Sequence, residues 1–462
     1  MQIHRSFQKY TAFNPKVPVW CLTSELDGCM HRFFNSSPVS PSGKYVAVFQ
    51  LPFEDRQPVS GEYGNVIIID LLDGGHFIAA QTCGWEPQLG ANITWGATDH
   101  ELFFNDVDID TWTTFAWKID PFSKQKVKLG GTVYQISPDG KWLLSPDVTL
   151  LGRVQSGYGV VVPREGLRRS PGLTADDGFF LTNTTSGESH LIVSIKDLIL
   201  KATPSVSIKN IEQYEFYGSH CEFNPQGTKI MMSLAWFEHT GDDVWNYAEN
   251  KLRTLHFAWF TMDFSGGPIY CALGPDQFSK GAHHAKWCPD GEHISLNLRL
   301  NRRAMLFVSF RYDGSELKEI IQNVQGSGHP SVHPNGYIVT DTYLGSWDYP
   351  QYGDGTVPIR WIDIYSGKET HAIRIPSEQP CEDFVLRVDP HPAWDASYRY
   401  LVFNGYLNGS RRVFFADMNT LIHSGHPVFI RKVQGYLKYI SFQIRRILRW
   451  VKRAFLGPFR NE

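Results

Sequence analysis

The stretch HAKWCPDG, residues 284–291, is one of seven copies of a short pattern in this chain of 462 residues. Each copy has a variable first residue, an apolar residue three positions later, a turn and a β-rich run. The turns read SPSG, GATD, SPDG, NPQG, CPDG, HPNG and DASY. The copies begin at Ser36, Asn92, Val133, His220, His284, His329 and His391. A period of roughly 40–60 residues with four short strands per unit is typical of a β-propeller.

The second half of each repeat supports this interpretation. Apolar and polar residues alternate there around an Asp, Asn, Gly or Ser turn, as in a β-hairpin. The segments are 65–75, 115–129, 179–193, 259–273, 306–320, 359–373 and 411–423. A common turn type recurring by chance would not alternate seven times with hairpins. The sequence therefore predicts an all-β fold, a seven-bladed β-propeller over residues 31–425.

Composition fits a large β protein and limits the functional classes. The chain is 42% hydrophobic and 14% aromatic, with 40 Gly and 27 Pro. Its seven cysteines are scattered without CxxC spacing, which favours a reducing compartment. We find no secretory signal and no run of 18 apolar residues, so we expect a cytoplasmic protein. No P-loop, GxSxG elbow or HExxH motif supports a nucleotide, serine-hydrolase or zincin site.

The two ends of the chain differ from the repeats. Residues 1–30 precede the first blade, and VPVWCLTSEL (17–26) is a candidate strand that closes the ring against the last blade. The segment 431–460 holds nine Lys or Arg and no acid. With Glu462 counted in this tail, residues 1–430 hold 35 basic and 46 acidic residues, a net charge of −11 against +8 on residues 431–462.

Apolar residues recur at helical spacing in the tail, from Val433 to Phe455, with basic residues largely on the other face. This pattern predicts a basic amphipathic helix over 429–462 that lies on an anionic membrane surface, peripheral to the inner membrane. The alternatives are a helix packed on the acidic propeller and a helix that binds a partner protein. The acidic body disfavours nucleic acid as a ligand.

Histidine occupies the first position in four consecutive copies. Inner strands line the channel of a propeller, so equivalent positions converge there. Neutral imidazole is a common ligand of divalent metals. We predict a Zn or Mn site at His284, His329 and His391, with His220 as a further candidate. Asp389, Gln325 and His283 are close enough in sequence to complete it. The alternative is that each histidine caps a strand end and bonds a backbone carbonyl.

A long insertion, residues 152–178, separates the third and fourth copies. It carries arginines and a tyrosine, namely Arg153, Tyr158, Arg164, Arg168 and Arg169. Long loops between blades often lie at a channel mouth and bear function. Arginine binds carboxylates bidentately, and tyrosine serves as an acid or base. The alternative is a solvated loop whose arginines pair with surface acids.

The repeats resemble those of the seven-bladed polysaccharide lyases, namely the oligogalacturonate and ulvan lyases, with TolB-type propellers as more distant relatives. The residues that carry the resemblance are 31–48, 84–96, 152–163, 220–232, 329–343 and 389–405, and it covers about residues 30–420. It implies β-elimination on an anionic, uronate-containing oligo- or polysaccharide. An Arg or a metal would neutralise the carboxylate, and a His or Tyr would remove the C5 proton.

On this resemblance we assign His220 as the base, Tyr158 as its acid or base partner and Arg153 as the carboxylate clamp. Arg164, Arg168 and Asn92 are assigned to substrate binding. Asn92 stands where such lyases often place a histidine. The alternative is a catalytically inactive propeller that binds glycan or protein at a membrane surface, for instance in exopolysaccharide assembly.

Overall fold

The computed structural model describes most of the chain. It covers residues 3–424 apart from 164, 166, 168, 239–254, 301–303, 346–348 and 379–383. Beyond residue 424 it describes six positions, which are Arg431, Lys432, Gly435, Ile440, Ile444 and Leu448. The predicted substrate contacts Arg164 and Arg168 therefore lie outside the described residues.

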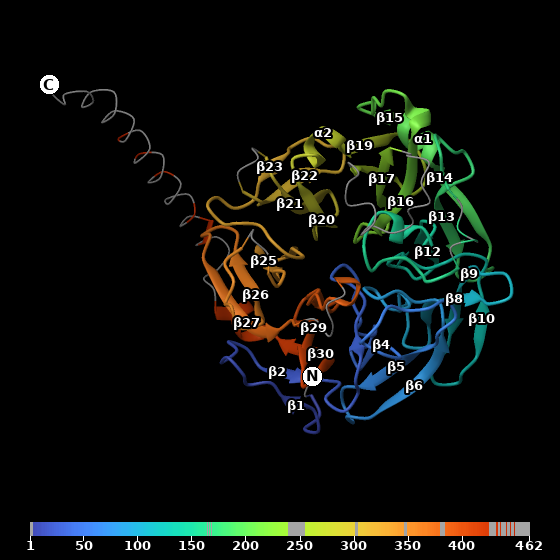
Figure 1. The fold of residues 1–462 in the computed structure, drawn as a ribbon. Helices are drawn as coiled ribbons and strands as arrows, with labels where there is room; N and C mark the ends of the chain where they lie inside the picture. The colour runs from blue at the N-terminus through green and yellow to red at the C-terminus, as the bar shows by residue number, and fades with distance from the viewer. Residues whose placement is uncertain are drawn as a thin grey trace.

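Thirty strands of the described residues form seven sheets around a common centre, as Figure 1 shows. The all-β, seven-bladed propeller predicted from the repeats is confirmed. From the inner strand outward, blade 1 consists of β3 (Cys29–Met30), β4 (Tyr45–Gln50), β5 (Gly64–Asp70) and β6 (His76–Thr82). Blade 2 consists of β7 (Thr94–Trp95), β8 (Leu102–Asp108), β9 (Thr113–Ile119) and β10 (Lys126–Lys128). Blade 3 consists of β11 (Gln135–Ile136), β12 (Trp142–Ser145), β13 (Gly178–Asn183) and β14 (Ser189–Ser194).

Blades 4 to 6 follow the same order. Blade 4 consists of β16 (Tyr214–Phe223), β17 (Lys229–Glu238), β18 (His256–Asp263) and β19 (Ile269–Leu273). Blade 5 consists of β20 (Ala282–Trp287), β21 (His293–Leu298), β22 (Leu306–Arg311) and β23 (Lys318–Glu319). Blade 6 consists of β24 (Ser331–His333), β25 (Tyr337–Thr340), β26 (Thr356–Asp363) and β27 (Glu369–Pro376). A fifth strand, β15 (Ala202–Thr203), joins blade 4 outside β19 and runs parallel to it. The sequence pattern did not predict this strand.

Blade 7 is built from both ends of the chain. Its inner strands are β28 (Ala393–Trp394), β29 (Tyr400–Leu407) and β30 (Ser410–Asp417). The N-terminal strand β2 (Val19–Cys21) pairs antiparallel with β30, and β1 (Gln8–Lys9) continues the sheet outward. Figure 1 shows these blue strands beside the red end of the ring. This pairing covers the edge of β30, which would otherwise be open to another chain.

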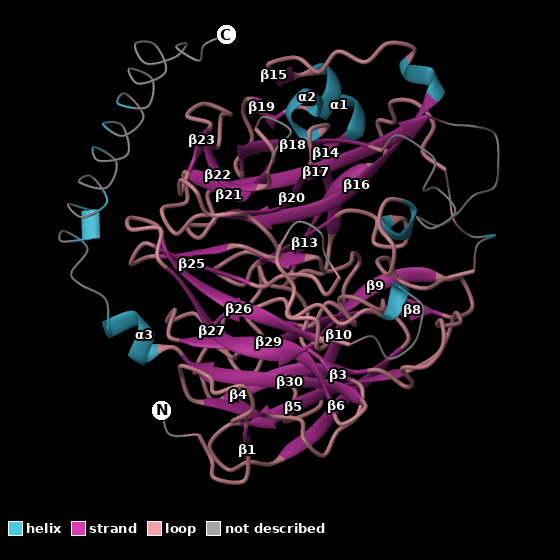
Figure 2. Cartoon of the chain, turned by 60° about the vertical axis from the view of Figure 1, so that its left-hand side comes forward, coloured by secondary structure: helices cyan, strands magenta, loops and turns pink. Residues whose placement is uncertain are grey.

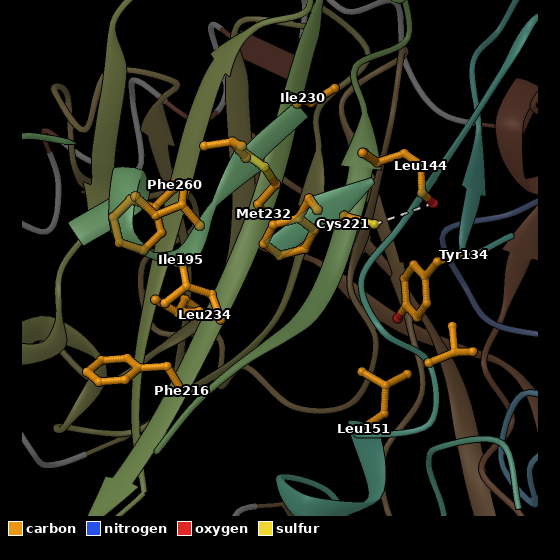
Figure 3. Close-up of a cluster of buried hydrophobic side chains, with 14 of the residues drawn as sticks. Tyr134, Leu144, Leu151, Ile195, Phe216, Cys221, Ile230, Met232, Leu234 and Phe260 are labelled. Atoms are coloured by element: carbon orange, nitrogen blue, oxygen red, sulfur yellow. Dashed lines mark hydrogen bonds between the residues drawn. The ribbon is translucent and has the colours of Figure 1, made fainter. Parts of the chain in front are cut away.

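The apolar residue of each repeat explains how neighbouring blades pack. Trp95 and Trp287 are buried, and their indole N–H groups donate to backbone oxygens of the preceding inner segment, Pro38 at 3.0 Å and Glu222 at 3.2 Å. In blades 2 and 5 the repeat residue therefore ties the blade to the one before it. Figure 3 shows the largest core, where side chains of β16, β17 and β18 meet Leu144 and Tyr134 of blade 3.

Helices are short and lie at the margins of the strands (Figure 2). They are α1 (Ile195–Leu200), α2 (Pro275–Phe278) and α3 (Asn419–Ser424), with 3-10 turns at Leu151–Arg153, Ile211–Gln213 and Phe384–Leu386. None of the helices in the described residues is long and apolar enough to span a bilayer.

The predicted tail helix falls almost wholly outside the described residues, so its amphipathic character and its membrane attachment stay predictions. Its beginning contacts blade 6. Arg431 donates to the Asn335 carbonyl at 2.6 Å and lies 3.5 Å from the Asp363 carboxylate.

Candidate functional site

The four repeat histidines converge on one aromatic side chain, Phe33. The ring centre of Phe33 lies 6.0 Å from His220, 6.1 Å from His284, 5.5 Å from His329 and 4.7 Å from His391. Phe33 follows β3 of blade 1, so a connection of the first blade fills the centre of the ring. We call His220, His284, His329 and His391 the histidine cluster.

Backbone irregularities place these side chains. The pairing of inner strands shifts register between Gly218 and Cys221 in blade 4 and between His283 and Lys286 in blade 5. Such bulges redirect side chains next to functional sites. His284 and His391 also adopt left-handed φ angles of 59° and 49°. Non-glycine residues hold that conformation only where the surrounding structure enforces it.

Three side chains of the cluster region have the spacing of a metal site. Ligand atoms of His329, His391 and Asp389 all lie within 4.8 Å of one another, and all three residues are buried. Asp341 orients two of them. Its carboxylate binds His329 Nδ1 at 2.9 Å, which leaves Nε2 for a cation, and accepts the His391 backbone N–H at 3.1 Å. A carboxylate behind a histidine ligand is a common second layer of metal sites.

His391 supplies the test of whether these residues fit a cation. Both of its ring nitrogens are buried, and neither has a hydrogen-bond partner among the described residues. Burial, with His329 adding to the effect, holds the pKa of His391 well below its usual range. The ring is therefore neutral, which is the form that binds a metal. Two imidazoles and a carboxylate suit Zn or Mn.

His284, the third predicted ligand, is replaced by Asp389 in this group. Its ring lies against His329, with ring centres 3.9 Å apart. Its Nδ1 lies 2.8 Å from the Gly328 carbonyl and 3.0 Å from the Tyr343 hydroxyl. These contacts match the alternative in which a histidine bonds a neighbouring carbonyl. His284 packs beside the candidate metal group and is not one of its three members.

An arginine that the sequence analysis missed stands beside the group. Arg387 donates from Nε to Asp389 at 2.9 Å and lies 5.8 Å from the Tyr158 ring centre. Arg387, Asp389 and His391 stand two residues apart along the chain, the spacing that places side chains on one face of a strand. That spacing is the signal that could have identified Arg387.

The predicted pair His220 and Tyr158 is brought together, with ring centres 6.1 Å apart. His220 Nδ1 accepts from the Tyr134 hydroxyl, and Nε2 lies 3.2 Å from Gln155 Oε1. Burial lowers the pKa of His220 to about 4, with a further contribution from Arg32. Burial raises the pKa of Tyr158. At neutral pH the pair is therefore a neutral imidazole and a protonated phenol.

Arg153, the predicted carboxylate clamp, is half of a buried ion pair. Its Nη2 lies 2.7 Å from Glu215 Oε2, and both side chains are almost fully buried. The guanidinium also lies over Tyr217, 5.3 Å from the ring centre. The charge of Arg153 is thus neutralised inside the protein by Glu215, so we do not assign Arg153 to binding of a substrate carboxylate.

Asn92, predicted to bind substrate, is buried in a polar network. It accepts from Arg32 Nε at 3.0 Å and donates to Glu86 Oε1 at 2.8 Å. The other Glu86 oxygen accepts from the Gly159 backbone N–H. The network therefore connects Arg32, next to the cluster, with the insertion that carries Tyr158. Arg32 Nη1 is buried and has no hydrogen-bond partner among the described residues.

This network predicts a pH dependence of stability. Burial raises the pKa of Glu86 from 4.5 to about 7, so the folded protein holds this proton more tightly than the unfolded chain. The stability it adds is complete below pH 4.5 and is lost as pH rises through 7. In the wild type we expect the free energy of unfolding to fall by about 3 kcal/mol over that interval. Glu86→Gln should abolish this fall.

Chemical denaturation at several pH values measures this effect. The control is Glu188→Gln, a change at an exposed glutamate, which should keep the wild-type slope. An identical slope in Glu86→Gln would show that Glu86 titrates normally.

No protein-family model and no curated protein sequence matches this chain. Solved structures do match. An oligogalacturonate lyase in complex with manganese is 12% identical, covers 91% of this chain and 98% of its own, and gives a TM-score of 0.57. The chain shares its fold with this lyase. The resemblance predicted from the sequence is thus confirmed at the level of the fold.

Two further propellers are similar at lower scores. The oligogalacturonate lyase of Vibrio parahaemolyticus is 10% identical over 90% of this chain and 97% of its own, with a TM-score of 0.40. TolB from Acinetobacter baumannii is 10% identical over 86% of both chains, with a TM-score of 0.37.

Proposed function

We propose that this lyase-like propeller binds a uronate-containing oligosaccharide at the histidine cluster and cleaves it by β-elimination. The observation that carries the proposal is the convergence of four histidines from four blades on one point. An acid, two arginines and a tyrosine stand beside them. The shared fold with a lyase supports it.

In such a reaction the C5 proton of a uronate is removed, the C4–O bond breaks and a C4=C5 double bond forms. His220, neutral at physiological pH, is suited to take the C5 proton once its bond with Tyr134 opens. Tyr158, which is protonated, is suited to supply a proton to the leaving oxygen. Arg32, whose Nη1 has no hydrogen-bond partner among the described residues, offers positive charge to the substrate carboxylate.

His329, His391 and Asp389 are the residues that would hold a divalent cation. A bound Mn²⁺ or Zn²⁺ supplies positive charge that neutralises the uronate carboxylate and acidifies the neighbouring C–H bond. Arg387 would keep its bond to Asp389, so the carboxylate would be shared between an arginine and a cation.

We expect the purified protein to bind about one Mn²⁺ or Zn²⁺ per chain, because two buried imidazoles and a carboxylate converge and no described residue makes a hydrogen bond to the His391 ring. His391→Ala should reduce the stoichiometry to near zero. Elemental analysis after dialysis against each metal measures it, and His190→Ala, at an exposed outer-strand histidine, is the control. A wild-type stoichiometry near zero would contradict the metal assignment.

One observation favours a second candidate function, that of a binding propeller without catalysis. Phe33 touches all four histidines, and the space next to His220 and His284 measures only about 20 Å³. That space holds about one water molecule. A sugar ring would need Phe33 to move. A propeller that binds glycan elsewhere would need no such movement.

Product formation separates the two functions. The metal-loaded protein is incubated with oligogalacturonate, ulvan and other uronate glycans, and the ultraviolet absorbance of the new double bond is followed. The proposal predicts rising absorbance with at least one glycan. Glycan binding without any absorbance change would favour the non-catalytic function.

A further inference from the structure

A second cavity, about 270 Å³ in volume, opens on the turn side of the histidine cluster. It is lined by residues that follow the repeat histidines along the inner strands, among them Glu222, Lys286, Trp394 and Tyr398. Glu222 and Lys286 follow His220 and His284 by two residues along strands β16 and β20. The elimination chemistry proposed above uses none of these residues.

Phe34 separates the cavity from the histidines. Its side chain lines the cavity, and its ring centre lies 5.8 Å from His284 and 5.3 Å from His329. Phe33 and Phe34 thus fill the middle of the ring, with the histidine cluster on one side and the cavity on the other.

The wall of the cavity contains polar atoms that the described protein leaves without partners. Glu222 is 7% exposed, and its Oε2 accepts no hydrogen bond from the residues that the structure describes. Asn35 Oδ1, a second wall acceptor, likewise has no partner among the described residues. Buried acceptors without partners cost free energy, so a ligand or solvent that donates to them is favoured.

Trp394 adds a donor to this wall. Its counterparts in the repeat, Trp95 and Trp287, donate their indole N–H groups to carbonyls of the preceding blade. The Trp394 side chain is 5% exposed, and its Nε1 has no acceptor among the described residues. Blade 7 therefore lacks a bond that two other blades make, and it lacks it at the cavity.

The charges in the wall balance. Lys286 donates to the Phe34 carbonyl at 2.9 Å, and its ammonium group lies 5.5 Å from the Phe34 ring centre. Lys286 and Glu222 attract each other. Burial raises the pKa of Glu222 and lowers that of Lys286, and each charge opposes the shift of the other. Glu222 would repel a ligand with a net negative charge, and Lys286 would repel one with a net positive charge.

We propose that this cavity binds a neutral, hydroxyl-rich molecule of the size of one sugar ring, a monosaccharide or a cyclic polyol. Hydroxyl groups both donate and accept, so one such ligand serves the acceptors Glu222 and Asn35 and the donors Trp394 and Lys286. The volume is at the lower end of small-molecule pockets, which suits a single ring. Phe34, Asn35 and Glu222 also line the small space next to His220 and His284, so the cavity adjoins the elimination site. Binding of the neutral ligand does not depend on the elimination chemistry.

Saturation-transfer NMR and titration calorimetry on the full chain test the site, with a panel of neutral hexoses, pentoses and inositols. We expect at least one member to bind. Ala396→Trp should then weaken binding at least tenfold, because Ala396 is an exposed residue of the cavity rim. The matched control is Ala97→Trp, at the same position of the GATD turn in blade 2, where the side chain is exposed and outside the cavity. It should bind as the wild type does.

Trp394→Phe keeps an aromatic ring and removes only the N–H, so it should weaken binding about three- to tenfold. It decides the question if Ala396→Trp fails to fold. The proposal is overturned if no panel member binds at tens of millimolar, or if binding persists unchanged in the folded variants. A preference for free galacturonate over the neutral hexoses would also overturn it.

Discussion

His220→Ala is expected to lower kcat for β-elimination by about 10²–10⁴-fold, the range that removal of a general base produces. His220 is the member of the histidine cluster that lies outside the candidate metal group and next to Tyr158. The loss should appear in kcat, while metal stoichiometry stays at the wild-type value. Initial rates of double-bond formation and elemental analysis of the same samples measure both.

The matched control is His76→Ala, at an exposed histidine on the outer strand of blade 1. It should leave the rate unchanged. If His220→Ala also keeps the wild-type rate, the base is another group. Tyr134, whose hydroxyl bonds His220, is then the next residue to replace.

Arg153→Met is expected to lower the free energy of unfolding by about 3–5 kcal/mol, because it leaves Glu215 as a buried charge that has lost its main partner. Arg169 approaches Glu215 at 3.2 Å but is partly exposed, so it compensates only in part. Equilibrium denaturation with urea measures the change. The double variant Arg153→Met, Glu215→Leu should be less destabilised than the sum of the single changes, since it removes both charges of the buried pair.

The control is Lys141→Met, which breaks an exposed pair with Asp139 and should cost less than about 1 kcal/mol. A stable Arg153→Met protein that no longer binds uronate glycans would contradict this account. It would restore Arg153 to the role of carboxylate clamp that the sequence suggested.

The repeat pattern was enough to predict the propeller and the meeting of the four histidines. In a closed ring, one repeat position maps to one height in the channel, so His220 and His391 both lie beside Phe33 although 171 positions separate them in the sequence numbering. A left-handed φ recurs at the first repeat position in Asn92, His284 and His391.

The repeat pattern did not predict contacts with residues that lie outside the repeat. Phe33 belongs to the connection after β3, and a single aromatic residue there carries no periodic signal. Glu215 meets Arg153 because β16 begins at Tyr214, several residues before the repeat copy at His220. The candidate metal group contains Asp389 and not His284. The contacts of His284 with Gly328 and Tyr343 depend on how blades 5 and 6 pack, which the repeat pattern does not show.

The mass of the products tests the central claim most directly. β-Elimination adds no water, so the two fragments of a cleaved oligouronate together have the mass of the substrate, and one carries the double bond. Mass spectrometry after incubation of the metal-loaded protein with a defined oligogalacturonate should show this pair with wild type and not with His220→Ala. Fragments whose summed mass exceeds the substrate by one water would mean hydrolysis and would contradict the account.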